Sequence, residues 1–385
     1  MSSDEATLSP AVLATRLRAG ERIHVLDVRN RAESEQWPLG GDNVETTHLP
    51  YMQFVQAQAK GDVADVVTDF DDGEQVVVIC GRGESSETVA DALRDHGVDA
   101  VNLEDGMRGW ARVYHAEEFD ADTAGATVIQ YQRPASGCLA YLVVSDDEAA
   151  VVDPLRTFAE RYVEDAREYG AELRYALDTH VHADHVSGVR DVAERSDAEL
   201  VVPEGATDRG LAFDAEEVDD GDELRVGDVI LEAMHVPGHT TEMTAYRVGN
   251  VLLGGDLLFT DSVARPDLER GDDGAEGMAR QLHRTLHDQV LSLPDETVVA
   301  PGHYSDASTP ADDGTYTATL GELKARLEAL SMDEEAFVDY ALSAMPPRPN
   351  NYEEIISTNL GRDSVGDEEA FELELGPNNC AATAD

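Results

Sequence analysis

The chain has 385 residues, 42% of them hydrophobic, a length that can hold two domains with separate cores. Eighty Asp and Glu residues face 28 Lys and Arg residues, so the formal net charge is −52 at pH 7. This charge argues against a nucleic-acid partner, because phosphates would be repelled. No apolar run approaches the roughly 20 residues that a membrane-spanning helix needs, so no membrane partner is expected.

The acidic residues are spread along the whole chain. This pattern is typical of halophilic proteins, which work near salt saturation, where screening removes self-repulsion. An acidic surface for a protein partner is the alternative. The N-terminal residues lack the basic and apolar regions of a signal peptide, which indicates a cytoplasmic location. The three cysteines, Cys80, Cys138 and Cys380, suit a reducing compartment without a disulfide framework.

Residues 1–118 alternate between apolar strands and helices. The sequence predicts strands at 23–28, 75–80 and 99–104, and an amphipathic helix over 85–97 that ends at Gly97. Strands that alternate with helices indicate an α/β fold with a parallel, doubly wound sheet. The small, acidic residues that follow predict a linker over 119–126.

Cys80 ends the second of these strands, in the stretch CGRGES. A glycine-rich turn before a helix would curl backbone N–H groups around the sulfur, lowering the thiol pKa and stabilising a bound anion or persulfide. A purely structural cysteine is the alternative. The rest of this predicted active loop consists of Gly81, Arg82, Gly83, Glu84 and Ser85, of which Arg82 is the only cation.

Residues 8–115 resemble the rhodanese family. The resemblance rests on VLDVR at 25–29, the six-residue loop CGRGES at 80–85, and DGMRGW at 105–110. It implies that residues 1–118 form a rhodanese-like sulfurtransferase domain. Cys80 would then accept a sulfane sulfur, with thiosulfate or sulfite as a small-molecule partner.

From residue 127 to residue 361 short strands predominate. Two β-rich halves with helices outside them indicate an αββα sandwich, with ligands carried at strand ends. Cys138 lies in one expected strand, CLAYLVV, and is expected to be inert. Residues 362–385 are acidic and polar, which predicts a mobile tail in which Cys380 is also inert.

Four motifs in this second part place histidine or aspartate directly after an apolar run. They are HVHADH, PGHT, GGDLLF and APGHYS, and they supply His180, His182, Asp184, His185, His239, Asp256 and His303. Ligands on loops at one edge of a rigid sheet would converge. Imidazole and carboxylate groups bind both zinc and iron, so the ligand types alone leave the metal open.

Residues 126–361 resemble the metallo-β-lactamase superfamily. A dinuclear zinc hydrolase of glyoxalase II type would bind one zinc through His180, His182 and His239. It would bind the second through Asp184, His185 and His303, with Asp256 bridging. Persulfide dioxygenases of the same superfamily would bind one Fe(II) per chain through His180, His239 and Asp256, a facial triad. In that case the remaining candidates would form a second metal position or support the iron ligands. These residues are His182, Asp184, His185 and His303.

Three features favour the dioxygenase. The segment ARPDL at 264–268 resembles the dioxygenase segment whose arginine and aspartate, here Arg265 and Asp267, support the iron pocket. Residues 334–361 resemble the short C-terminal closure of those enzymes, and a rhodanese-like domain makes sulfur common to both sites. The expected reaction oxidises a low-molecular-weight thiol persulfide with O2 to sulfite and thiol. A zinc thioester hydrolase, a non-catalytic sulfur carrier and a homo-oligomeric state remain open.

Overall fold

The computed structural model describes residues 6–63, 75–343 and 345–382. These residues form two compact units. The first unit runs to Tyr114 and includes 133–136, and the second comprises 115–132 and the chain from Gly137 onward. No helix in the described ranges is long and apolar enough to cross a bilayer.

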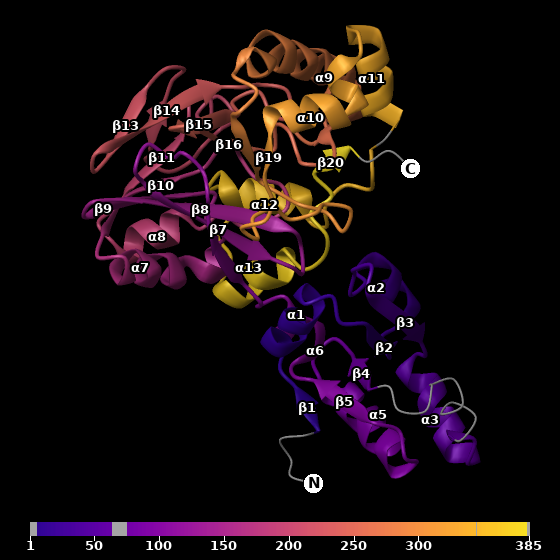
Figure 1. Ribbon diagram of the computed structural model, residues 1–385. Helices are drawn as coiled ribbons and strands as arrows, with labels where there is room; N and C mark the ends of the chain where they lie inside the picture. The colour runs from indigo at the N-terminus through magenta and orange to yellow at the C-terminus, as the bar shows by residue number, and fades with distance from the viewer. Residues whose placement is uncertain (1–5, 64–74, 344, 383–385) are drawn as a thin grey trace. The chain divides into compact units, whose positions relative to one another are not determined.

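The first unit is built on one five-stranded sheet in which every strand pair is parallel (Figure 1). The strands in spatial order are β1 (Thr7–Leu8), β5 (Ala100–Leu103), β4 (Val76–Ile79), β2 (Ile23–Asp27) and β3 (Val44–His48). The helices are α1 (Pro10–Arg18), α2 (Arg31–Gln36), α3 (Tyr51–Lys60), α5 (Glu84–Asp95) and α6 (Gly106–Trp110). The predicted doubly wound α/β fold is therefore confirmed.

The second unit contains two larger sheets. The seven-stranded sheet has the order β12 (Glu216–Val218), β11 (Glu199–Pro203), β10 (Glu172–Leu177), β9 (Glu148–Val152), β8 (Cys138–Ser145), β7 (Thr127–Arg133) and β6 (His115–Glu118). The six-stranded sheet has the order β13 (Glu223–Val226), β14 (Val229–His235), β15 (Thr244–Val248), β16 (Val251–Gly255), β18 (Val298–Pro301) and β19 (Ala318–Thr319).

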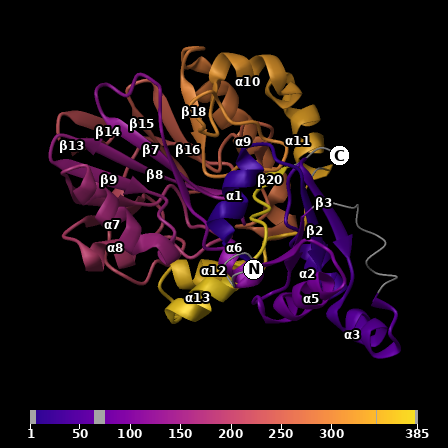
Figure 2. The same cartoon turned by 60° about the horizontal axis from the view of Figure 1, so that its bottom comes forward.

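The two sheets pack face to face around a core that both supply. Tyr141 and Val143 from β8 lie in this core with Leu231 from β14 and Leu253 from β16. The helices α7 (Ala159–Glu168) and α8 (Val189–Arg195) cover the first sheet. The second sheet is covered by α9 (Gly271–Asp288), α10 (Leu320–Arg326) and α11 (Glu334–Ser343) (Figures 1 and 2). The predicted αββα sandwich is confirmed.

The second unit begins earlier in the chain than predicted. Residues 115–118, expected in the first domain, form β6 and pair antiparallel with β7. The expected linker 119–126 consequently lies inside the second unit. The short, polar stretch HAEE does not signal a strand, because β6 lies at the edge of its sheet and only one of its faces is partly buried.

Residues 362–382 are also folded, contrary to the mobile tail that their composition predicts. They contain α13 (Asp367–Leu373), which follows α12 (Tyr352–Asn359), and β20 (Ala381–Ala382), which pairs with β17 (Val263–Ala264). Phe371 is 2% exposed and Cys380 is fully buried. A few apolar side chains among the acids are enough to anchor this segment.

Candidate metal centre and thiol loop

The seven predicted ligands meet at one edge of the sandwich. Four of them lie in the loop after β10, and the others follow β14, β16 and β18. All seven are at most 6% exposed. The apolar strands therefore carry these polar residues into a common buried site, as the motif positions predict.

Three of the ligands form a group of their own. Single ligand atoms of His180, His239 and Asp256 lie within 4.8 Å of one another. Asp256 Oδ2 lies 3.8 Å from His180 Nε2 and 3.6 Å from His239 Nε2. Both His180 Nε2 and Asp256 Oδ2 are buried and have no hydrogen-bond partner among the described residues. Buried nitrogen and oxygen atoms that converge in this way, and that lack hydrogen-bond partners, are suited to bind a metal ion.

Hydrogen bonds on the far side of each imidazole fix its orientation. The Thr179 hydroxyl donates to Asp153 Oδ2 at 2.9 Å, so its oxygen accepts from His180 Nδ1, also at 2.9 Å. His239 Nδ1 donates to the Arg265 carbonyl at 2.8 Å. With both Nδ1 atoms protonated, each Nε2 presents its lone pair to the group, which is the arrangement that metal-binding histidines require.

Charge in the site follows from burial and from neighbouring residues. Burial and the nearby His182 place the pKa of His180 well below its usual value, so this imidazole is neutral. Burial opposes ionisation of Asp256, yet the charge and hydrogen bond of His303 hold the pKa of that carboxyl below its usual value. Neutral imidazoles and an ionised carboxylate are the metal-binding forms of these groups.

Two glycines allow Asp256 to approach the loops around it. Gly255 has a φ of 51°, and a β-carbon there would collide with the Thr179 side chain. A β-carbon on Gly302 would lie 2.6 Å from Asp256 Oδ1. The motifs GGD and PGH therefore need glycine for steric reasons as well as for the turn.

The remaining predicted ligands form other groups. His182 Nε2 donates to Asp153 Oδ1 at 3.1 Å, and its ligand atom groups with Asp153 and Asp178. His303 bridges two carboxylates, with Nδ1 2.6 Å from Asp256 Oδ1 and Nε2 2.8 Å from Asp184 Oδ2. His303 therefore orients Asp256, and Oδ2 of that carboxylate stays without a hydrogen-bond partner among the described residues.

Arg265 and Asp267 lie behind the group and are both nearly fully buried. The Arg265 guanidinium pairs with Asp267 at 2.7 Å and donates to the carbonyls of Pro347 at 3.0 Å and Asn379 at 2.8 Å. Since the Arg265 carbonyl also accepts from His239, one residue links a candidate ligand to the C-terminal segment.

Sequence reasoning missed several residues that the fold brings to the site. Cys138 Sγ lies 3.2 Å from Asp184 Oδ2, and Cys380 groups with Asp184, Asp256 and His303. Both thiols, which the sequence predicts to be inert, therefore lie beside candidate ligands. Asn359 holds the HVHADH loop by donating to the carbonyls of His182 at 3.0 Å and His185 at 2.9 Å.

The predicted active loop of the first unit curls around the Cys80 sulfur. Gly83 N–H and the Ser86 hydroxyl each donate to Cys80 Sγ at 3.1 Å. The helix that follows begins at Glu84, one residue before its expected start, with Gly83 as N-cap at a φ of 89°. The thiol is buried, and Gly81, Arg82 and Glu84 are exposed.

The DGMRGW motif supports this loop from behind. Met107 N–H donates to the Cys80 carbonyl at 2.8 Å, and Arg108 N–H donates to the Gly81 carbonyl at 3.1 Å. Burial and the positive charges of Arg82 and Arg112 lower the pKa of Arg108. Arg82 and Arg112 thus lie close enough to Arg108 to act on it electrostatically, and only Arg82 belongs to the loop.

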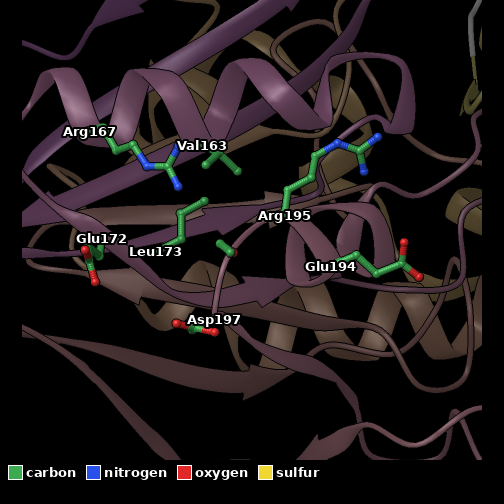
Figure 3. Close-up of a pocket in the computed structure, with 8 residues that line it drawn as sticks. Val163, Arg167, Glu172, Leu173, Glu194, Arg195 and Asp197 are labelled. Carbon is green, nitrogen blue, oxygen red and sulfur yellow. The ribbon is translucent and has the colours of Figure 1, made fainter.

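A further pocket lies at the other end of β10. Its volume is about 250 Å³, and it is lined by residues of α7, α8 and the start of β10. Leu173 lies between Arg167 and Arg195, and both arginines are exposed (Figure 3). The candidate ligands follow the opposite end of β10, so this pocket is not part of the metal group.

The chain matches two family models and several known proteins. Residues 133–303 match the metallo-beta-lactamase superfamily, and residues 9–113 match the rhodanese-like domain. A hydroxyacylglutathione hydrolase of Xanthomonas euvesicatoria is 35% identical over 163 residues, 42% of this chain and 58% of that protein. The chain thus spans less than two thirds of that relative.

Two similar proteins carry the name ETHE1. The human mitochondrial persulfide dioxygenase ETHE1 is 26% identical over 246 residues, which cover 62% of this chain and 89% of that protein. The crystal structure of ETHE1 from Myxococcus xanthus is 27% identical, with a TM-score of 0.53, and covers 60% of this chain and 97% of that chain. Together with the two family matches, these relatives show that the chain belongs to the metallo-beta-lactamase superfamily and carries a rhodanese-like domain before that fold.

Proposed function

We propose that this protein is an iron-dependent persulfide dioxygenase with a sulfurtransferase domain. In the proposed reaction one low-molecular-weight persulfide, one O2 and one water yield one thiol and one sulfite. The terminal sulfur is oxidised and dioxygen is reduced. When bound, Fe(II) would supply the redox chemistry that joins oxygen to this sulfur.

The group formed by His180, His239 and Asp256 carries the proposal. It offers two imidazoles and one carboxylate, the ligand set of mononuclear iron oxygenases, and leaves coordination positions for substrates. The hydrogen bond from His303 to the second oxygen of Asp256 orients this carboxylate. The persulfide dioxygenase relative is also covered over 89% of its length, against 58% for the hydrolase.

The residues around this group have positioning tasks in the proposed site. Thr179 and the Arg265 carbonyl hold the two imidazoles in the tautomer that binds metal. Burial of all three ligands keeps bulk water away from a reactive intermediate. We further propose that Cys80 receives a sulfane sulfur from thiosulfate, releasing sulfite, in a loop whose N–H groups stabilise the charged persulfide.

The acidic composition supports a second part of the proposal. A formal charge of −52 without a concentrated acidic tail is expected for a protein of a high-salt cytoplasm, where ions screen carboxylate repulsion. We propose a halophilic, cytoplasmic enzyme on this basis.

Metal analysis and oxygen uptake in molar salt test the proposed reaction. We expect about one iron per chain, and O2 consumption with sulfite formation from an added persulfide. His239→Ala and Asp256→Ala should abolish both metal retention and O2 uptake. The rate of O2 uptake by His303→Ala should fall only about 10- to 100-fold, because His303 orients Asp256 without belonging to the triad. Zinc instead of iron, thioester hydrolysis without O2 uptake, and an inactive His303→Ala enzyme would identify a hydrolase.

A further inference from the structure

Glu242 is a buried acidic residue that follows His239 closely in the chain. Because β14 ends at His235 and β15 begins at Thr244, Glu242 belongs to the same loop as His239. The residue is 2% exposed, and its Oε2 is buried without a hydrogen-bond partner among the described residues. A buried carboxylate is costly unless other groups bind it, so its contacts indicate what it does.

The other oxygen of this carboxylate, Oε1, binds two further loops. Val181 N–H donates to Oε1 at 3.0 Å, and Val181 lies between the candidate ligands His180 and His182. Arg209, in the loop after β11, donates from Nη1 to the same oxygen at 2.6 Å. The Glu242 side chain is 1% exposed and that of Arg209 is 10% exposed, so the ion pair is almost buried. Glu242 therefore joins its own loop to the loops after β10 and β11.

The backbone around His180 is tied twice to the segment that leads into β15. On one side the Thr179 carbonyl accepts from Thr244 N–H at 2.8 Å, a bond between backbone groups. On the other side Val181 N–H is held by the Glu242 side chain. Only the second tie depends on a side chain. Its loss would free the backbone on one side of His180 and displace the imidazole from the proposed iron group.

The ion pair with Arg209 does not by itself explain a carboxylate at this position. Desolvation of the two charges offsets much of their attraction, so a buried ion pair is weak evidence of a contribution to stability. The hydrogen bond from Val181 N–H gives the carboxylate a second task. Because the guanidinium approaches the same oxygen, it limits the positions that the Glu242 side chain can adopt. The pair therefore holds the acceptor oxygen in reach of the backbone.

We propose that Glu242 is a positioning residue of the proposed iron site, where its carboxylate keeps the imidazoles of His180 and His239 in a fixed relation. It would act through the backbone of the ligand loops and not through the ion. This inference rests on the proposed function, since it takes both imidazoles as ligands of one ion. Loops that are held in this way preserve the geometry of the site before the metal binds, which favours binding.

Three replacements of Glu242 separate the reach of the side chain from its charge. Glu242→Gln keeps the length and an acceptor oxygen for Val181 N–H but loses the charge. Glu242→Asp keeps the charge but is one methylene shorter, and Glu242→Ala removes both properties. If positioning is the task, glutamine should replace glutamate and aspartate should not. Glu232→Ala, an exposed change on β14, is the control.

Hydrogen exchange of the full-length, metal-free protein in molar salt measures the tie itself. In the peptide that contains Val181, one amide should exchange about 10- to 100-fold faster in Glu242→Asp and Glu242→Ala than in the unchanged protein. Glu242→Gln and the control should keep this amide protected. Circular dichroism confirms that each variant is folded.

Competition with a chelator in the absence of oxygen then measures the affinity for Fe(II). We expect it to fall about 10- to 100-fold in Glu242→Asp and Glu242→Ala, and less in Glu242→Gln. A protected Val181 amide in Glu242→Asp would overturn the proposal, and so would an affinity that falls in Glu242→Gln but not in Glu242→Asp. If the unchanged protein bound no iron, the proposed function would fail, whereas the exchange measurement needs no metal and would still show whether Glu242 holds the loop.

Discussion

Asn359 fastens the loop that carries four of the candidate ligands, and its replacement tests whether that loop needs support from the C-terminal region. The side chain is 8% exposed at the end of α12. Its Nδ2 donates to the His182 and His185 carbonyls, and its Oδ1 accepts from Ser187 N–H at 2.9 Å. Asn359→Ala would leave all three backbone groups without this partner.

Each buried polar group left unsatisfied costs about 1–3 kcal/mol. Water that enters the space left by the side chain can restore part of this, so we expect the free energy of unfolding to fall by about 3 kcal/mol. A loosened loop should also weaken metal binding by roughly 10- to 100-fold, as loss of outer hydrogen bonds commonly does.

Equilibrium unfolding in urea at fixed molar salt measures the first effect, and competition with a chelator measures the second. Asn359→Asp sharpens the test, because it keeps the size of the side chain but places a carboxylate against two carbonyls. It should destabilise at least as much as alanine. Glu354→Gln, an exposed change on the same helix, is the control. Unchanged stability and metal affinity in Asn359→Asp would refute the reasoning.

Three further outcomes are expected. Cys80→Ser should abolish sulfur transfer from thiosulfate but leave O2 uptake on an added persulfide; retained transfer would place the acceptor sulfur elsewhere. Burial opposes ionisation of Asp27, but hydrogen bonds from Arg29 hold the pKa of its carboxyl below the ordinary 3.8. The stability from this pair is thus complete above that value and lost as pH falls through the lower, folded-state pKa. In acid titrations followed by circular dichroism, Asp27→Asn should lose less stability as the pH falls than the unchanged protein does. An acid-unfolding curve that the substitution does not alter would contradict this. Secondary structure should also decrease as salt falls well below molar, because −52 charges lose their screening, and a fold that is stable in dilute buffer would exclude halophilic adaptation.

The sequence was most informative where a strand is buried on both faces. Continuous apolar runs predict β2, β4 and β5 closely, and the residues directly after such runs include His239, Asp256 and His303. The strand β3 escaped prediction because VETTH contains one aliphatic residue and is only partly buried. Asp153 ends an apolar run as Asp256 does, so the same signal could have found the residue that orients Thr179.

Other parts of the site depend on packing between distant segments. Cys138 and His303 are adjacent only because the two sheets meet at an isolated bridge. Cys380 lies near Asp256 because β20 pairs with β17. A two-residue strand in a polar segment cannot be predicted from the sequence. Local periodicity carries no information on either contact, so both thiols looked inert.

The double role of Arg265 has a consequence for how the protein matures. Its carbonyl orients His239, while its guanidinium is held by the backbone of Pro347 and Asn379. During synthesis on the ribosome, the loop that bears His239 emerges long before residue 379. The imidazole therefore lacks its final support until almost the whole second unit has been translated. Metal acquisition should thus follow translation of this region, and a nascent chain arrested before residue 379 should capture the ion weakly.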